Sequence, residues 1–458
     1  MGNQRSLTNW EGLDCGMCRY RMKRGVGRML ARTIRRTGVF FADIYRDFMI
    51  NLSKVEGNAR YLCLSQLLWS VTYTWYTPLM TQYMKDIGLS NSQVGIINGV
   101  TMFLGMIVAL FATWITDRMG RRYAFMLADV ASWAVGCAVW ALTNSFAGFL
   151  IAAVCQATIR INSVAWSCML VEGVPPENRL SVFAVINLTG VAAAFCAPLA
   201  NLLILPLGLV PAMRIILGGS SIMYITHFLW RHKRLVDTDI SIARKEQTKG
   251  TSPLAGLKDY PMYFRIIGSN KLLLAMVIVK ALYMVVINFR NVYLSITVVQ
   301  GLHFDITMMS IINLVNGAVM LLCQLLIVPK LSRFDQRKGL MVGILIGLSS
   351  HILLIFAPAN QIIFLMASVV GTGVFMVLAA MLIDTMFANA IEDKYRSGVL
   401  GVMGLISVGA SAPFQYLGGV LADLPVIGSR MPMIIISTLL CVCLLAFLPV
   451  ARKMGKNL

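Results

Sequence analysis

Apolar segments about 20 residues long recur along the chain, and short polar segments separate them. A helix needs about 20 such residues, rising 1.5 Å each, to cross a hydrocarbon layer about 30 Å thick. Gly and Pro recur inside the segments, which membrane helices tolerate better than soluble ones. The pattern predicts twelve transmembrane helices, at about 59–82, 93–115, 123–143, 146–170, 180–205, 211–230, 271–296, 306–328, 339–357, 360–388, 396–421 and 430–450.

The composition supports this interpretation. Of the 458 residues, 58% are hydrophobic and 13% are charged, whereas a soluble domain has about 45–50% apolar and about 25% charged residues. A soluble chain would have to bury the excess in one core, and cores stop growing at about 250–300 residues. An all-α integral membrane protein is therefore predicted.

The net charge of +20 raises the possibility of nucleic-acid binding, so its distribution matters. Lys and Arg are concentrated before the first predicted helix, between Arg231 and Lys271, in four links on the same side, and in the C-terminal tail. The opposite links hold little beyond Lys85, Arg214 and Arg430. This positive-inside bias predicts that both termini are cytoplasmic. The basic excess therefore indicates membrane topology, and no nucleic-acid partner is expected.

A polar linker divides the predicted helices into two groups of six. The chain is expected to comprise five parts: a basic cytoplasmic segment 1–58, a six-helix bundle 59–230, a cytoplasmic linker 231–270, a second six-helix bundle 271–450 and a cytoplasmic tail 451–458. The first segment can be interpreted as an amphipathic helix on anionic lipid or as a solvated tail, and both interpretations stay open.

The two halves repeat each other with a constant offset of 215 residues. Ile96-Ile97-Asn98 matches Ile311-Ile312-Asn313, and Ala197-Pro198 matches Ala412-Pro413. Arg118 and Arg122 match Arg333 and Arg337 on the same register. Parallel repeats of this kind are typical of transporters that alternate around a central site. The sequence therefore predicts two pseudo-symmetric six-helix bundles.

The link between the second and third predicted helices contains a specific motif. It reads Thr113-Trp-Ile-Thr-Asp117-Arg118-Met-Gly120-Arg121-Arg122. This resembles the G-x-x-x-D-R-x-G-R-R signature of the major facilitator superfamily, and a bacterial member is expected. Thr113 replaces the usual glycine, and the second copy is degraded at Ser332, Asp335 and Gln336.

The resemblance implies a role for this motif as a cytoplasmic gate. In the family, such a loop holds the two halves together on the cytoplasmic side in one conformation and releases them in the other. Gly120 permits a tight turn, and the arginines can reach carboxylates or lipid phosphates with forked donors. The gate residues are Asp117, Arg118, Gly120, Arg121 and Arg122. The alternative is that these charges only set topology.

Ionisable groups inside membrane helices are costly and indicate function. Arg160 and Lys280 lie roughly 21 Å and 14 Å along their helices, near mid-membrane. Asp129 is expected to pair with the Arg122 loop, Asp384 is a candidate proton carrier near the cytoplasm, and Arg290 is expected near the outer surface. The alternatives are that Arg160 caps backbone carbonyls and that Lys280 snorkels to the surface.

Polar residues recur with helical periodicity on three of the four helices that, by the resemblance, line the central cavity. Gln156, Arg160, Ser163 and Ser167 share one face; Lys280, Tyr283 and Asn291 share another; Gln66, Tyr73 and Thr77 share a third. The predicted substrate cavity therefore comprises Arg160, Lys280, Gln156, Ser163, Gln66, Tyr73, Tyr283 and Asn291.

Three functional hypotheses follow. The first is a secondary active transporter that moves an organic anion by alternating access. Aromatic and Met-rich walls favour a second, the proton-coupled efflux of lipophilic drugs. The third is a membrane sensor or lipid-handling protein that does not transport. No nucleophile–base set, phosphate loop or metal spacing is visible, so neither enzymatic activity nor a cofactor or metal is expected. A monomer in the plasma membrane, surrounded by lipid, is expected.

The predicted topology can be tested by thiol labelling. A single cysteine placed at Ser252, in the linker, should resist a membrane-impermeant thiol reagent in intact cells, because the positive-inside rule puts it in the cytoplasm. The label should appear after the cells are permeabilised. Rapid labelling of intact cells would reverse the orientation.

Overall fold

The computed structural model of the chain describes residues 55–172, 174–175, 178–254, 257–258, 260–328, 335–391, 395–425 and 427–454, together with Arg46 and Met49. Most of the basic N-terminal segment lies outside the described residues, as do Cys15, Cys18 and Arg333. The described part is helical, and it contains no strand. The all-α prediction is confirmed.

Each predicted transmembrane segment corresponds to one helix or to a stack of short helices. The first six are α2–η1–α3 (Gly57–Tyr76, Thr77–Leu79, Met80–Asp86), α4 (Asn91–Met119), α5–η2–α6 (Arg121–Asp129, Val130–Val135, Gly136–Leu142), α7–α8 (Phe146–Ala157, Ile159–Val171), α9–η4–α10 (Arg179–Cys196, Ala197–Ala200, Asn201–Leu207) and α11 (Leu209–Arg234). The last six are α14–η6 (Lys271–Ile296, Thr297–Gly301), α15 (Met308–Leu326), α17 (Gln336–Ile355), α18 (Ile362–Asn389), α19 (Arg396–Ala422) and η8–α20 (Gly428–Arg430, Met431–Met454).

Eleven helices of the described part are long and apolar enough to cross a membrane. The predicted segment that is not among them is the first one, around α2. Polar residues dilute its apolar character, among them Gln66, Thr72 and Thr74. Two of them, Gln66 and Thr74, line cavities that are described below.

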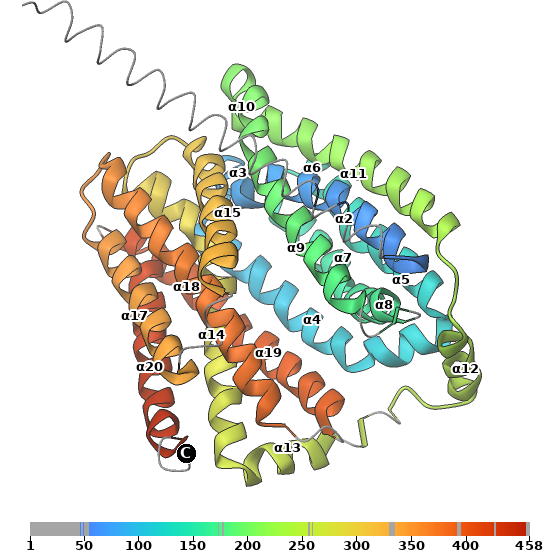
Figure 1. The fold of residues 1–458 in the computed structure, drawn as a ribbon. Helices are drawn as coiled ribbons and strands as arrows, with labels where there is room; N and C mark the ends of the chain where they lie inside the picture. Colours follow the sequence, from blue (N-terminus) through green and yellow to red (C-terminus); the bar gives the residue numbers. More distant parts are fainter. Residues whose placement is uncertain are drawn as a thin grey trace, which may run out of the picture.

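The helices gather into two bundles (Figure 1). We call α2–α11 the N-terminal bundle and α14–α20 the C-terminal bundle. Helices α12 (Asp239–Thr248), at the lower right of the view, and α13 (Tyr260–Ser269), at the bottom, connect them. We call this end of the molecule the linker side and the opposite end the far side. The most extensive helix–helix contact joins the bundles and is made by α4 and α19.

Hydrogen bonds between the bundles lie on the far side. Ser92 at the start of α4 donates from its amide to Asp423 Oδ2 at 2.8 Å, and the Asn91 amide donates to Asp423 Oδ1 at 3.1 Å. On the same side, Thr81 donates to the Val292 carbonyl at 2.7 Å and Asn201 donates to the Thr307 carbonyl at 3.2 Å. No hydrogen bond between the bundles is found toward the linker side within the described residues. The protein is therefore closed on the far side.

Glycines bring the backbones of α4 and α19 together beside these hydrogen bonds. A Cβ added to Gly419 would lie 2.4 Å from the Asn91 carbonyl oxygen, and one added to Gly95 would lie 2.7 Å from the Gln415 carbonyl oxygen. Only glycine allows such an approach. Small residues serve the same purpose wherever membrane helices pack closely.

Asp423 supplies acceptors to the free amide groups at the N-terminus of α4. Burial alone would raise the pKa of Asp423, but hydrogen bonds from Ser92 and the Asn91 amide lower this pKa below its ordinary value. A carboxylate is also favoured by the partial positive charge of a helix N-terminus. Because the pKa is lowered in this contact, the carboxylate stabilises far-side closure at neutral pH. The stabilisation is lost as the pH falls through the lowered pKa.

Replacement of Gly419 by Ala should weaken far-side closure, because the added methyl group overlaps backbone atoms of α4. The expected cost is about 1–3 kcal/mol, as for other overpacked sites. Spin labels on cysteines at Lys85 and His303 should report a shift toward longer distances between the bundles. Gly401→Ala on the same helix is the matched control, since nothing lies within 4 Å of its added Cβ.

An unchanged distance distribution in Gly419→Ala would show that the close contact does not control closure. The same label pair should also shift toward longer distances as the pH is lowered through the pKa of Asp423.

Candidate functional site

Three cavities lie along α2 and share Tyr73 as a wall residue. The central cavity, about 340 Å³, lies between α2–α3, α4, α7–α8 and α14. The linker cavity, about 380 Å³, opens among α2, α5, α8 and α11. The side cavity, about 170 Å³, lies between η1, α14 and α15. The central cavity and the side cavity are lined by both bundles, as expected for a transport route between them.

The central cavity contains four of the predicted substrate-cavity residues: Arg160, Gln156, Tyr73 and Asn291. The linker cavity contains three: Gln66, Ser163 and Tyr73. The polar faces predicted for the first and fourth membrane segments therefore do face cavities. Their function as substrate contacts stays a prediction.

Arg160 projects into the central cavity without a protein counter-charge. It takes part in no hydrogen bond or ion pair within the part of the chain that the structure describes, and its buried Nε lacks any partner. Gly105 leaves room for it, since a Cβ at this position would lie 3.3 Å from Nε. The alternative that Arg160 caps backbone carbonyls is therefore not supported by the contacts.

Gln156 has a structural task as well as a cavity position. Its Nε2 donates to the Ser132 carbonyl at 2.5 Å, within the π-helical segment η2. A π-helical turn leaves such a carbonyl without its regular partner. One donor of Gln156 is therefore already committed to the backbone.

Lys280 was expected near mid-membrane and Asp384 near the cytoplasm, and no pairing between them was predicted. In the structure the two side chains form an ion pair between α14 and α18. Lys280 also lies over the Phe387 ring, with Nζ 5.2 Å from its centroid. The predicted depths refer to backbone positions, but the long lysine side chain extends from its own position on α14 toward the carboxylate. Lys280 and Tyr283 are not among the residues that line the three cavities.

Asp129 was expected to pair with the Arg122 loop, and this expectation is wrong. Its carboxylate pairs with Arg231 at the end of α11, and both side chains are buried. The Arg231 guanidinium lies 4.0 Å from the centroid of the Phe125 ring and 4.9 Å from that of Phe228. Both charged residues also border the linker cavity.

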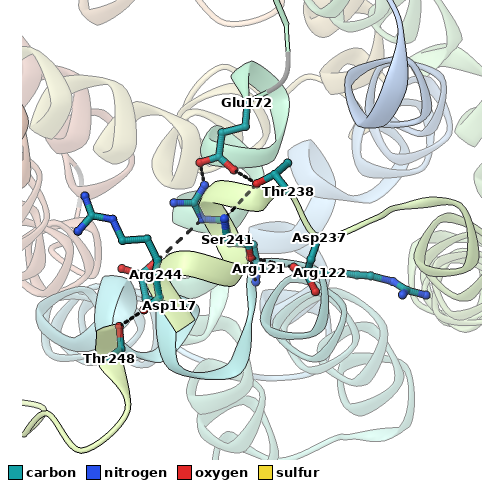
Figure 2. Close-up of polar contacts among 9 residues, drawn as sticks. All are labelled: Asp117, Arg121, Arg122, Glu172, Asp237, Thr238, Ser241, Arg244 and Thr248. Atoms are coloured by element: carbon teal, nitrogen blue, oxygen red, sulfur yellow. Dashed lines mark hydrogen bonds and ion pairs between the residues drawn. The ribbon is translucent and has the colours of Figure 1, made fainter. Parts of the chain in front are cut away.

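The gate motif forms the turn between α4 and α5, where Gly120 has φ +88° and ψ 139°. Because this conformation is strained for other residues, a glycine is required here. Gly120 has no side chain to cap α5, and the linker supplies the caps instead (Figure 2). The Arg121 amide donates to Ser241 Oγ at 3.3 Å, and the Arg122 amide donates to Asp237 Oδ1 at 3.2 Å.

Arg121 is the buried centre of this region, which we call the linker cluster: Asp117, Arg121, Arg122, Glu172, Asp237, Thr238 and Ser241 (Figure 2). Its guanidinium pairs with Glu172, and the two side chains are 7% and 10% exposed. Asp117 lies 3.9 Å from Arg121 Nε. Thr238 donates to the second Glu172 oxygen at 2.7 Å. The cluster therefore fastens the linker to the N-terminal bundle.

Arg118 contributes less to this arrangement. It is exposed, and it donates to the Thr248 carbonyl at 3.3 Å. The described contacts of the motif go to its own bundle and to the linker. The predicted gate contact with the C-terminal bundle therefore stays a prediction for the conformation in which the far side opens.

Several cavity residues were not predicted. Trp133, Trp140, Met80, Met84 and Met102 line the central cavity but carry no polar periodicity. The internal repeat did contain a usable signal, because its matched residues Asn98 and Asn313 line the central and side cavities respectively.

Comparisons with known proteins agree with this architecture. Residues 62–296 match the Major Facilitator Superfamily. Among solved structures, the nucleoside transporter NupG superposes with a TM-score of 0.67 at 12% identity, over 86% of this chain and 99% of that one. A POT family transporter in complex with 5-aminolevulinic acid gives a TM-score of 0.67 at 12% identity, over 88% and 99%. At such identities the likeness shows the fold alone. No curated protein matches the sequence.

The linker cluster predicts unequal effects of two arginine substitutions. Arg121→Ala leaves Glu172 buried without its counter-charge, and we expect it to lower the stability of the purified protein by about 3–5 kcal/mol. Arg118→Ala should change stability by no more than about 0.5 kcal/mol, since the side chain is exposed. Thermal unfolding in detergent would measure both. Equal stability of the two variants would contradict a structural role for the Arg121–Glu172 pair.

Proposed function

This chain belongs to the major facilitator superfamily, and from that premise we propose that it is a secondary transporter that carries an organic anion through the central cavity. The family identifies the chain as a membrane transporter and not an enzyme. The choice of an anion depends on one observation, the unpaired Arg160 guanidinium in the central cavity.

Burial of a fixed charge in a membrane protein costs free energy unless a counter-charge reaches it. Asp129 and Asp384 are already paired with other cations. A solute that brings a carboxylate or phosphate would complete the site, and the planar guanidinium suits both groups because it donates two parallel hydrogen bonds.

The remaining wall indicates what else this solute contains. Tyr73 stacks on Trp69 with ring centroids 4.8 Å apart and meets Trp133 edge to face at 5.6 Å. Met80, Met84 and Met102 add flexible apolar surface. An acidic group attached to an apolar or aromatic body fits both features of the cavity.

Drug efflux is the second candidate, and the same aromatic and Met-rich wall favours it. In that mechanism Asp384 would carry the coupling proton. This carboxylate pairs with Lys280 between α14 and α18. Proteins of similar fold include a nucleoside transporter and a POT family transporter in complex with 5-aminolevulinic acid, so the fold alone does not decide between the two candidates.

We also propose that transport proceeds by alternating access, as a monomer in the plasma membrane with both termini in the cytoplasm. The far-side hydrogen bonds support one half of the cycle, a state closed outward and accessible from the linker side. In the other half, Asp117 and Arg118 would contact the C-terminal bundle.

The decisive test is the affinity of purified protein for labelled benzoate, compared with labelled tetraphenylphosphonium. Arg160→Lys should weaken benzoate binding about tenfold, because the charge remains while the forked geometry is lost, and Arg160→Ala should weaken it more. The paired Lys280 is not expected to bind the solute, so Lys280→Ala should have the smaller effect.

Normal benzoate binding by Arg160→Ala would contradict the proposal. Preferred binding of the lipophilic cation by the wild-type protein would favour drug efflux. Binding without uptake into liposomes would favour the sensor hypothesis.

A further inference from the structure

A second arginine lies buried between the bundles. Arg290 was expected near the outer surface; its side chain is 5% exposed and lines the side cavity. Distance along α14 gives depth and not the direction of the side chain, so the sequence did not predict that Arg290 faces a cavity. Arg290 takes part in no hydrogen bond or ion pair found among the described residues.

The wall around Arg290 is built for polar contact. Asn291, Asn313 and Asn316 line the same cavity, and Asn316 Oδ1 is buried without a hydrogen-bond partner. Thr77 and Tyr73 complete the wall from the N-terminal bundle. Carboxamides can donate to an anion and can also accept from a neighbouring hydroxyl or amine.

This cavity adjoins the one that contains Arg160. Tyr73, Thr77 and Asn291 line both of them, so the two arginines face neighbouring spaces from opposite bundles. The central cavity and the side cavity measure about 340 and 170 Å³. A solute that extends past Asn291 would contact both cations at once.

We propose that Arg290 is a second anion-binding group and that the transported solute carries two acidic groups, one bound by Arg160 and one by Arg290. This inference rests on the proposed function. Two unpaired cations, Arg290 buried and Arg160 half-buried, are neutralised by one dianion, whereas a monoanion leaves one of them without a counter-charge. The arrangement also joins the bundles through the solute.

The test compares diacids with monoacids of the same chain length on the purified protein: succinate with butyrate, glutarate with valerate, adipate with hexanoate, and suberate with octanoate. At one chain length, the diacid should bind at least about tenfold more tightly than its monoacid, since a charged hydrogen-bonded pair is added. Arg290→Gln should abolish this advantage and leave monoacid binding unchanged. Arg160→Gln should weaken the binding of both classes.

Two further variants control the result. Arg290→Lys should retain part of the diacid preference, and it provides a charged variant if Arg290→Gln does not fold. Arg214→Gln removes an arginine on the far side that lines none of the three cavities, and it should leave the preference intact.

Three outcomes would overturn the inference. In the first, no diacid binds more tightly than the monoacid of the same chain length. In the second, Arg290→Gln weakens the binding of both classes equally, which would make Arg290 structural. In the third, chloride added to the wild-type protein alters acid binding and Arg290→Gln abolishes only this effect, which would assign the side cavity to an inorganic ion. If the wild-type protein binds neither class, the proposed function fails and this inference fails with it.

Discussion

A charged side chain within a membrane protein needs a counter-charge, and this constraint organises the molecule. Asp129 has its counter-charge in Arg231, and Lys280 has its counter-charge in Asp384. In the linker cluster, Arg121 has its counter-charge in Glu172. Among the described residues, Arg160 and Arg290 have no counter-charge, and both face cavities where the bundles meet. The paired charges therefore support the framework, while the unpaired ones are the groups that we propose a solute binds.

Helix α4 connects these sites mechanically. The amides at its N-terminus donate to the Asp423 carboxylate of the C-terminal bundle, and its C-terminus leads through Gly120 into the linker cluster. The same helix lies against Arg160 at Gly105 and against α19 at Gly95. A rotation of α4 relative to α19 would therefore change far-side closure, the cavity and the linker together.

Much of the fold was predictable from the sequence because hydrophobic length sets the membrane segments. The predicted helix positions agree with the observed ones mostly to within a few residues. The polar faces of α2 and α8 were also predictable, since helical periodicity fixes which residues share a side. Pairing was not predictable. Asp129 and Asp384 were placed by depth alone, and depth does not determine which helix packs beside which.

The side cavity shows a second limit of such predictions. Asn291 was assigned correctly to a cavity, but its neighbour Arg290 was not, although the two are adjacent on α14. Adjacent residues on a helix point about 100° apart, yet both line the side cavity. The other walls of this cavity come from η1 and α15, and the pattern of one helix cannot reveal which neighbours it packs against.

The glycine contact between α4 and α19 affects how fast the two bundles can separate and close again on the far side. Surfaces that interlock through long side chains must freeze rotamers each time they meet, and each such side chain loses up to about 2 kcal/mol of conformational entropy. Here backbone meets backbone at Gly95 and Gly419, so no rotamers are ordered at these positions. Such a contact can separate and re-form many times with little entropic barrier, as repeated closure of the far side would require.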